Sequence, residues 1–423
     1  MSPSFSALVE KISGWTGDTA SLVALLRSSL PLLQENAETL PNILEAFSME
    51  SSPVVFMFLL EAFVTVYPEA DHRKVCEFLK SCSQATAASA PSAFTDLGRR
   101  LKDWAVKTSQ PKLAILPLRS AILKLQPTPE HLTPLHADFF QVCLLAKCYH
   151  AAVPILEQPI YNVAADVLST TPRDFMLYAY YGGLLQIGRK EYGAAMEMLL
   201  HAVTTPATTV SAIAVAAYQK YALVHLIDRG TTPVLPKRTP SMVGRYIKTE
   251  LKAYQELINA FTSGNVQSLE RAASAFKQAF EADGNWGLIR LCLETLRRRK
   301  INRLTHTHLT LSLQGIAEAC DLDSPEVAED YILQMVGKGE IFASIDERGG
   351  MVSFEEDPEQ YRSAKVAALI DARIKSSIVI DQKLAEANNA IRCDPAYLSR
   401  LAPQRSLGMA IGMDEDVGPS FGA

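Results

Sequence analysis

The chain has 423 residues, of which 48% are hydrophobic and 21% charged, with 41 basic and 46 acidic side chains. This length and apolar content allow about two to four domains with sizeable cores and exclude a wholly disordered chain. The formal net charge of -5 gives no global attraction to nucleic acid or to anionic membranes. The seven cysteines are scattered, which predicts a reduced protein. The amino end has no secretory pattern, and the most apolar run, 54–60, is too short to span a membrane. Together these features predict a protein of the cytoplasm and nucleus.

Closely spaced prolines divide the first half of the chain into short apolar segments. Because proline lacks an amide donor and clashes with the preceding turn, each one is expected to start, kink or end a helix. We predict short helices packed in pairs, with the Ala- and Ser-rich stretch 81–92 as a loop.

Two helical stretches joined by a short turn at 188–190 are predicted after Tyr178. Ala195, Leu199 and Ala202 recur at helical spacing, which places them on one face for a neighbouring helix. The pair resembles a degenerate tetratricopeptide unit, and stacked units of that kind form a solenoid. Residues 1–200 are therefore assigned to an amino-terminal helical-repeat array.

Longer helices are predicted between 242 and 324, where the chain has no proline. They cover 243–261, 266–282 and 285–301, and the domain 201–300 is expected to be helical. The first of them carries an apolar stripe at near-helical spacing, formed by Tyr246, Leu251, Tyr254, Leu257, Ile258 and Phe261.

Residues 301–360 have the pattern of a winged helix. A helix over 309–322 precedes a second helix over 324–339, for which Ser324 is the expected N-cap, Pro325 the first residue and Gly339 the end. Alternating apolar residues over 340–354, interrupted by a Gly-rich turn, predict a two-stranded hairpin.

A single long helix is predicted over 363–392, within a segment 361–395 that ends near a proline. Its apolar residues Ile374, Leu384 and Ile391 lie among charged ones, and its length of about 45 Å exceeds what one small winged helix can cover. We favour a bundle with partner helices over folding back onto the chain. The Gly-rich and acidic residues 396–423 are expected to form a disordered tail.

Six blocks of sequence in a fixed order carry a family resemblance between about Ala164 and Pro358. They read YYGGLLQIG, TTPA, AYQKYALV, VGRYIK, INRLTHTHLTLSL and GEIFASIDERGGMVSF. With the array, winged helix and terminal helix, they resemble the PCI family of scaffold subunits, which is shared by the proteasome lid, the COP-9 signalosome and translation initiation factor three. The resemblance is strongest to a signalosome subunit, and an equivalent subunit of the proteasome lid is the alternative.

The resemblance implies a mainly α fold and a non-catalytic subunit of the complex that removes a ubiquitin-like modifier from cullins. Winged helices of neighbouring subunits would join edge to edge, and terminal helices would gather in a bundle. Signalosome subunits one and eight are the expected neighbours. The expected wing contacts are Phe342, Ser344, Met351 and Ser353, although the hairpin alone would equally suit a simple cap of the domain.

Two groups of residues suggest metal chemistry. His306 and His308 have the spacing seen in metalloproteases that accompany this family, but Ile316 and Ala319 stand where such enzymes carry a serine and an aspartate. We interpret the histidines as polar residues at a helix start. Cys143 and Cys148, with His150 nearby, lie in an apolar segment interpreted as one helix without a second ligand pair. No catalytic residue, cofactor or metal is therefore expected, and a metal-dependent isopeptidase remains only as an alternative.

Nucleic-acid binding is disfavoured by local charge. Residues 301–360 contain three basic and thirteen acidic side chains, a local net charge of -10 that would repel phosphates. The one basic run, 297–300 with Arg303, is interpreted as the solvated carboxyl end of a helix, with a salt-sensitive contact to an acidic partner as the alternative.

Overall fold

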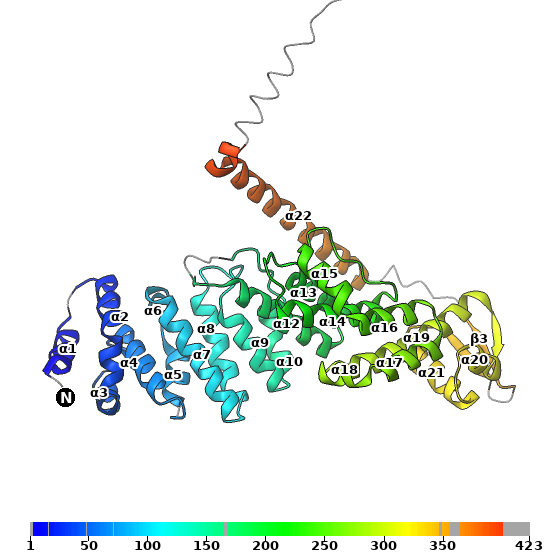
Figure 1. The fold of residues 1–423 in the computed structure, drawn as a ribbon, viewed down its shortest axis with the longest axis horizontal. Coiled ribbons are helices and arrows are strands. Elements are labelled where there is room, and N and C mark those ends of the chain that lie inside the picture. The colour runs from blue at the N-terminus through cyan, green and yellow to red at the C-terminus, as the bar shows by residue number, and fades with distance from the viewer. Residues whose placement is uncertain are drawn as a thin grey trace, which may run out of the picture. The chain divides into compact units, whose positions relative to one another are not determined.

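The computed structural model describes residues 3–400 except 16, 48, 71, 164–167, 347–348 and 356–363. Within these residues the chain is mainly helical, with one three-stranded sheet (Figure 1). The chain divides into two units, Met1–Phe354 and Glu355–Ala423, and each is described by itself.

The array of the first unit is built from successive helices that share one apolar core, with buried members from Phe5 to Leu296. In Figure 1 these helices follow one another from the blue amino end to the green middle of the chain. They are α1 Pro3–Ser13, α2 Thr19–Glu35, the 3-10 turn Ala37–Thr39, α3 Leu40–Ala46, α4 Pro53–Val66, α5 Arg73–Ser81, α6 Gln84–Ser89, α7 Pro91–Lys107, α8 Lys112–Leu125, α9 Leu135–Leu145, α10 Tyr149–Leu156, α12 Pro172–Arg189, α13 Tyr192–Thr204 and α14 Ala212–Asp228.

Proline and serine set several helix starts. Pro53 and Pro91 lie in the first turns of α4 and α7, where a missing amide donor costs no hydrogen bond. The prediction of a loop over 81–92 is wrong, because α6 lies inside it. The Ser83 hydroxyl accepts a hydrogen bond from the Thr86 amide and caps this helix, whose alanines have high helix propensity.

The predicted tetratricopeptide-like pair is present as α12 and α13. Its turn contains Lys190, which adopts a left-handed conformation with φ 64°. Ala195, Leu199 and Ala202 are all fully buried, as their spacing predicts. A Cβ atom at Gly183 of α12 would lie 2.7 Å from Cγ of Leu199, so this glycine permits the close approach of the two helices.

Two of the three long helices predicted after residue 242 are divided in the structure, whereas the third, predicted over 285–301, is the continuous helix α19 Trp286–Thr307. Residues 243–261 form α15 Ser241–Glu250 and α16 Lys252–Thr262, while 266–282 form α17 Val266–Ala275 and α18 Lys277–Ala282. The bridging residues Leu251 and Phe276 leave the helical conformation and pack against the core, so tertiary packing overrides local propensity. In the predicted stripe, Tyr246 is exposed and the other five residues are buried.

The winged helix has its own apolar core and three strands instead of two. Its elements are β1 Thr310–Ser312, α20 Leu313–Ala319, α21 Pro325–Gly337, β2 Ala343–Asp346 and β3 Met351–Phe354. The helix predicted over 309–322 is wrong in its first part, because β1 pairs with β3 and Leu311 packs against the second core. The Ser324 cap, Pro325 at the start of α21 and the left-handed Gly339 at its end are confirmed.

The second unit contains α22 Ala364–Cys393, a helix of 30 residues. The prediction of one long helix that ends near Asp394 is confirmed. The prediction of a disordered tail over 396–423 is wrong for residues 396–400, which are helical, and residues 401–423 lie outside the described residues.

Candidate subunit interfaces

Hydrogen bonds between β1 and β3 fix the direction of the main-chain groups across the sheet. The strand order is β1-β3-β2, so β3 is central. The Phe354 amide donates to the Leu309 carbonyl at 2.8 Å, and the Leu313 amide donates to the Gly350 carbonyl at 2.9 Å. Because main-chain groups alternate in direction along a strand, the even-numbered residues of β3 face β1 and the odd-numbered ones face β2.

The same alternation leaves two residues of β2 with main-chain groups that point away from the sheet. Ser344 and Asp346 lie opposite the odd-numbered residues of β3 and therefore bond to it. The amides and carbonyls of Ala343 and Ile345 face outward, and no described strand pairs on that side. The outer edge of β2 is thus a template for a further strand.

The predicted wing contacts divide between an edge strand and the central strand. Ser344 on β2 and Met351 and Ser353 on β3 project from the outer face of the sheet, since the intervening Val352 is fully buried. Phe342 is half-buried and precedes β2. Because β3 is paired on both sides, Met351 and Ser353 can offer side chains to a partner but no main-chain hydrogen bonds.

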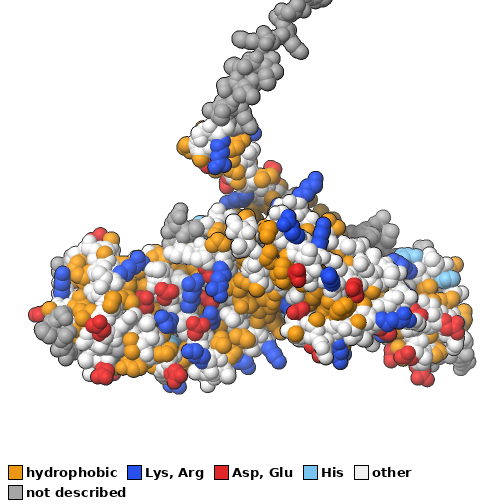
Figure 2. Space-filling model, viewed as in Figure 1, with side chains coloured by type: hydrophobic (Ala, Val, Ile, Leu, Met, Phe, Trp, Pro, Cys, Tyr) orange, Lys and Arg blue, Asp and Glu red, His pale blue; other side chains and the backbone are white. Residues whose placement is uncertain are grey.

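The surface of the winged helix is acidic. Figure 2 shows acidic side chains gathered over this domain, at the right-hand end of the view. Asp323, Glu326 and Asp330, at the start of α21 or on it, are exposed, and no ion pair joins them to a cation in the described part of the chain. Such a helix would repel phosphates in a DNA groove.

Helix α22 exposes large apolar side chains along its length. Ile374, Leu384 and Ile391 are 55%, 66% and 56% exposed. Ile370, Leu384 and Ile391 are separated by multiples of seven residues, which is the spacing of a coiled-coil seam. Ile374 follows Ile370 by four residues, about one helical turn. This helix therefore has the pattern of one that packs against other helices.

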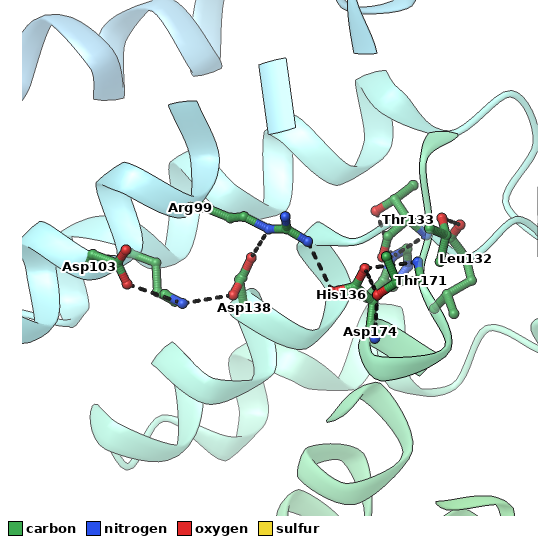
Figure 3. Close-up of polar contacts among 10 residues, drawn as sticks. Arg99, Asp103, Leu132, Thr133, His136, Asp138, Thr171 and Asp174 are labelled. Carbon is green, nitrogen blue, oxygen red and sulfur yellow. Dashed lines mark hydrogen bonds and ion pairs between the residues drawn. The ribbon is translucent and has the colours of Figure 1, made fainter. Parts of the chain in front are cut away.

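Within the array, a charged network holds three helices together (Figure 3). Arg99 of α7 lies 3.0 Å from Asp174 of α12 and 3.7 Å from Asp138 of α9. Asp174 also accepts from the Thr171 amide and hydroxyl, so it caps α12 as well as anchoring Arg99. Burial raises the pKa of Asp138, and Lys102 at 3.0 Å opposes that shift. The groups bond to one another, as expected of a structural network.

Sequence reasoning missed a buried polar network at the end of the array. The Lys220 ammonium donates to the side-chain carbonyl of Asn285. The side-chain NH2 group of Asn285 donates to the Tyr254 hydroxyl at 2.7 Å, and this hydroxyl in turn donates to the Asp283 carboxylate at 2.7 Å. Burial lowers the pKa of Lys220, and Asp283 opposes that shift. The signal was a lysine in the largely apolar segment AYQKYALV.

The residues considered for metal chemistry do not gather. His306 is in the last turn of α19 Trp286–Thr307 and His308 follows it, so the prediction that they begin a helix is wrong. Both are exposed, and no group of three potential ligands occurs among the described residues. The segment around Cys143 and Cys148 forms two helices, α9 and α10, instead of one. Burial raises the pKa of Cys143 to about 12, which disfavours a thiolate.

The basic run 297–300 is also placed differently from the prediction. Helix α19 continues to Thr307, so the run is not at the carboxyl end of its helix. Its side chains bond to acidic and carbonyl groups of this same chain.

Comparisons with known proteins agree with this architecture. A family model described as COP9 signalosome complex subunit 3, N-terminal helical repeats, matches residues 16–243, and a PCI domain model matches residues 272–356. A COP9 signalosome complex subunit 3 from Arabidopsis thaliana is 35% identical over 412 residues, which cover 95% of this chain and 94% of the relative. The chain belongs to the COP9 signalosome complex subunit 3 family. A relative of the same description from Dictyostelium discoideum is 33% identical over 384 residues, 89% of this chain and 91% of the relative.

Family membership decides between the predicted functions. The predicted fold class and the prediction of a non-catalytic PCI scaffold subunit of the signalosome are confirmed. The proteasome-lid alternative and the isopeptidase alternative are not supported, because the family model of the amino-terminal repeats and both relatives name the signalosome subunit. No helix in the described part of the chain is long and apolar enough to cross a bilayer.

Proposed function

We propose that this chain joins neighbouring signalosome subunits through the outer edge of β2 and through α22. The array spaces the partners, subunits one and eight are the winged-helix neighbours, and the remaining subunits meet α22 in a helical bundle. The complex acts on cullins by removing a ubiquitin-like modifier, in the cytoplasm and nucleus. The working domain limits are 1–200, 201–300, 301–360, 361–395 and 396–423.

The outward main-chain groups of Ala343 and Ile345 carry the proposal for the wing. Two amides and two carbonyls are available to an added strand, and each main-chain hydrogen bond contributes a net stabilisation of about 0.5–1.5 kcal/mol. Four bonds would supply about 2–6 kcal/mol, with Phe342, Ser344, Met351 and Ser353 as side-chain contacts that give specificity. The acidic surface of α21 favours a protein neighbour over a nucleic acid.

The exposed apolar residues of α22 support the second contact. Burying a leucine or isoleucine side chain stabilises by about 1.5–3 kcal/mol, so leaving Ile374, Leu384 and Ile391 in water forgoes a large stabilisation. Helices from other subunits would cover this face through the seven-residue spacing of its apolar residues.

A proline on each sheet edge tests the wing. Ala343→Pro removes one outward amide of β2 without breaking a bond to β3, and Thr310→Pro removes an outward amide of β1, so the two changes are chemically matched. We expect Ala343→Pro to weaken binding to one of the two neighbours about tenfold in titration calorimetry, whereas Thr310→Pro leaves that affinity unchanged. Wild-type affinities for both neighbours in both variants would show that neither edge is used.

Removal of the terminal helix tests the bundle separately. Truncation after residue 363 should abolish co-purification with the bundle subunits while the thermal midpoint of the array stays the same, because α22 belongs to a separate unit. Normal co-purification of every subunit by the truncated chain would exclude a bundle role for α22.

A further inference from the structure

The first unit contains two apolar cores that meet along a single helix. The core of the array ends with Leu296 of α19, and the core of the winged helix begins with Ile301 of the same helix. No buried apolar residue in the described ranges belongs to both cores. Each core packs on its own part of this continuous helix, and the hydrophobic effect stabilises each core without a buried apolar side chain that bridges the two. The basic run Arg297–Lys300 occupies the interval between the two cores.

Two residues of the run bond to the array. The Arg297 guanidinium lies 2.7 Å from Glu270 of α17. The Arg299 guanidinium donates to the carbonyls of Ile227 at 3.3 Å and Asp228 at 2.6 Å, at the carboxyl end of α14. These carbonyls carry the negative end of the helix dipole and lack partners within the helix, so a cation is favoured there.

The other two residues bond to the winged helix. The Arg298 guanidinium donates to Gln334 of α21 at 3.3 Å and lies 3.4 Å from Glu340, which follows α21. The Lys300 ammonium lies 2.7 Å from Asp321, in the turn between α20 and α21. Successive residues of one helical turn therefore reach alternately to the array and to the winged helix.

A cavity beside the run shows that apolar packing is incomplete at this junction. Its volume is about 680 Å³, and its lining includes Arg298, Arg299, Asp228, Lys338 and Glu340. The ion pairs are partly exposed, with 20–26% of the basic side chains and 36–45% of their acidic partners accessible. Such pairs are individually weak and are screened by salt.

We propose that Arg297–Lys300 form an electrostatic joint that sets the angle of the winged helix relative to the helical-repeat array. Removal of the charges on the winged-helix side frees that angle while both cores stay folded, because neither core includes the run. The joint is built into the free chain and presents the winged helix in one orientation before any partner binds.

Distance measurements between spin labels on the full chain test this joint. Labels are placed at Gln267→Cys on α17 and Glu326→Cys on α21, two exposed positions, after the half-buried and exposed cysteines Cys76, Cys148 and Cys393 are replaced by serine. We expect a narrow distance distribution that broadens or shifts in R298E/K300E. Reversal of both partners, in R298E/K300E/D321K/E340R, should restore the original distribution.

The matched control is R290E/R303E, which changes the charge of the same helix by the same amount. Arg290 and Arg303 are exposed and make no ion pair with a described residue. An unchanged distribution in R298E/K300E, or an equal change in the control, would overturn the proposal. If circular dichroism shows that R298E/K300E does not fold, the same distance distribution is measured on the otherwise wild-type labelled chain while the salt concentration is raised from about 0.05 M to about 1 M. Broadening then supports the joint, and an unchanged distribution refutes it.

Discussion

Gly183 tests how closely α12 and α13 must approach. In Gly183→Ala, the new Cβ would lie 2.7 Å from Cγ and 2.8 Å from Cδ2 of Leu199. Leu199 is fully buried, so it cannot turn into solvent. Either its side chain leaves a favourable rotamer or the two helices separate. Gly193, near the start of α13, is the matched control, because a Cβ there has no neighbour within 4 Å.

The two substitutions should have opposite signs. Overpacking in a core destabilises by about 1–3 kcal/mol, while replacing a helical glycine by alanine stabilises by about 0.5–1 kcal/mol. The sum predicts that Gly183→Ala destabilises by about 1 kcal/mol. Gly193→Ala gains the helix term without the clash and stabilises by up to about 1 kcal/mol.

Native-state amide hydrogen exchange measures the difference within this helix pair, without assuming that the whole chain unfolds in one step. Peptides from α12 and α13 should exchange about fivefold faster in Gly183→Ala and more slowly in Gly193→Ala. Slower exchange in both variants would mean that the helices have room for a methyl group, and the packing argument would be wrong.

Three further substitutions give predictions of defined sign. Burial lowers the pKa of His136 from 6.5 to about 4. The contribution of the neutral imidazole to stability is therefore full above about pH 6.5 and is lost as the pH falls toward 4. In His136→Gln, the midpoint of urea unfolding should fall less steeply over this pH range. Burial, reinforced by Asp96, raises the pKa of Glu61 from 4.5 to about 7. Ionisation of this carboxyl group above about pH 4.5 therefore destabilises the fold. Glu61→Gln should raise the midpoint of urea unfolding at about pH 8 but not at about pH 4. Gly230 has φ 69°, and a Cβ added there would lie 2.5 Å from the Arg299 guanidinium. Gly230→Ala should therefore lower the thermal midpoint of the protein. An unchanged midpoint would contradict the argument from backbone strain.

Features with a local cause were predictable from the sequence. Ser324, Pro325 and Gly339 bound α21 because a cap, a fixed φ and a left-handed residue act within one turn. The wing hairpin and the pair α12 and α13 followed from apolar periodicity in the same way. The apolar face of α22 was visible in the sequence, although which helices cover it is a property of the partners.

Features that depend on distant partners were not predictable. Strand β1 exists because β3, about forty residues later in the chain, offers it a ladder, and three residues alone have no strand signal. The breaks at Leu251 and Phe276 follow from where each side chain finds the core. The outward direction of the Ala343 amide depends on the register of both ladders, which an isolated hairpin does not define.

The basic run shows most clearly why charge has to be assigned to partners before it is interpreted. In the sequence, four consecutive cations suggest a surface for an acidic partner, and the winged helix at -10 suggests a basic one. In the fold, Arg298 and Lys300 already bond to Glu340 and Asp321 of the winged helix. These two cations are thus committed to internal contacts and are unavailable to phosphates. What the domain still offers is the polar edge of β2 and an acidic helix, and both of these suit a protein neighbour.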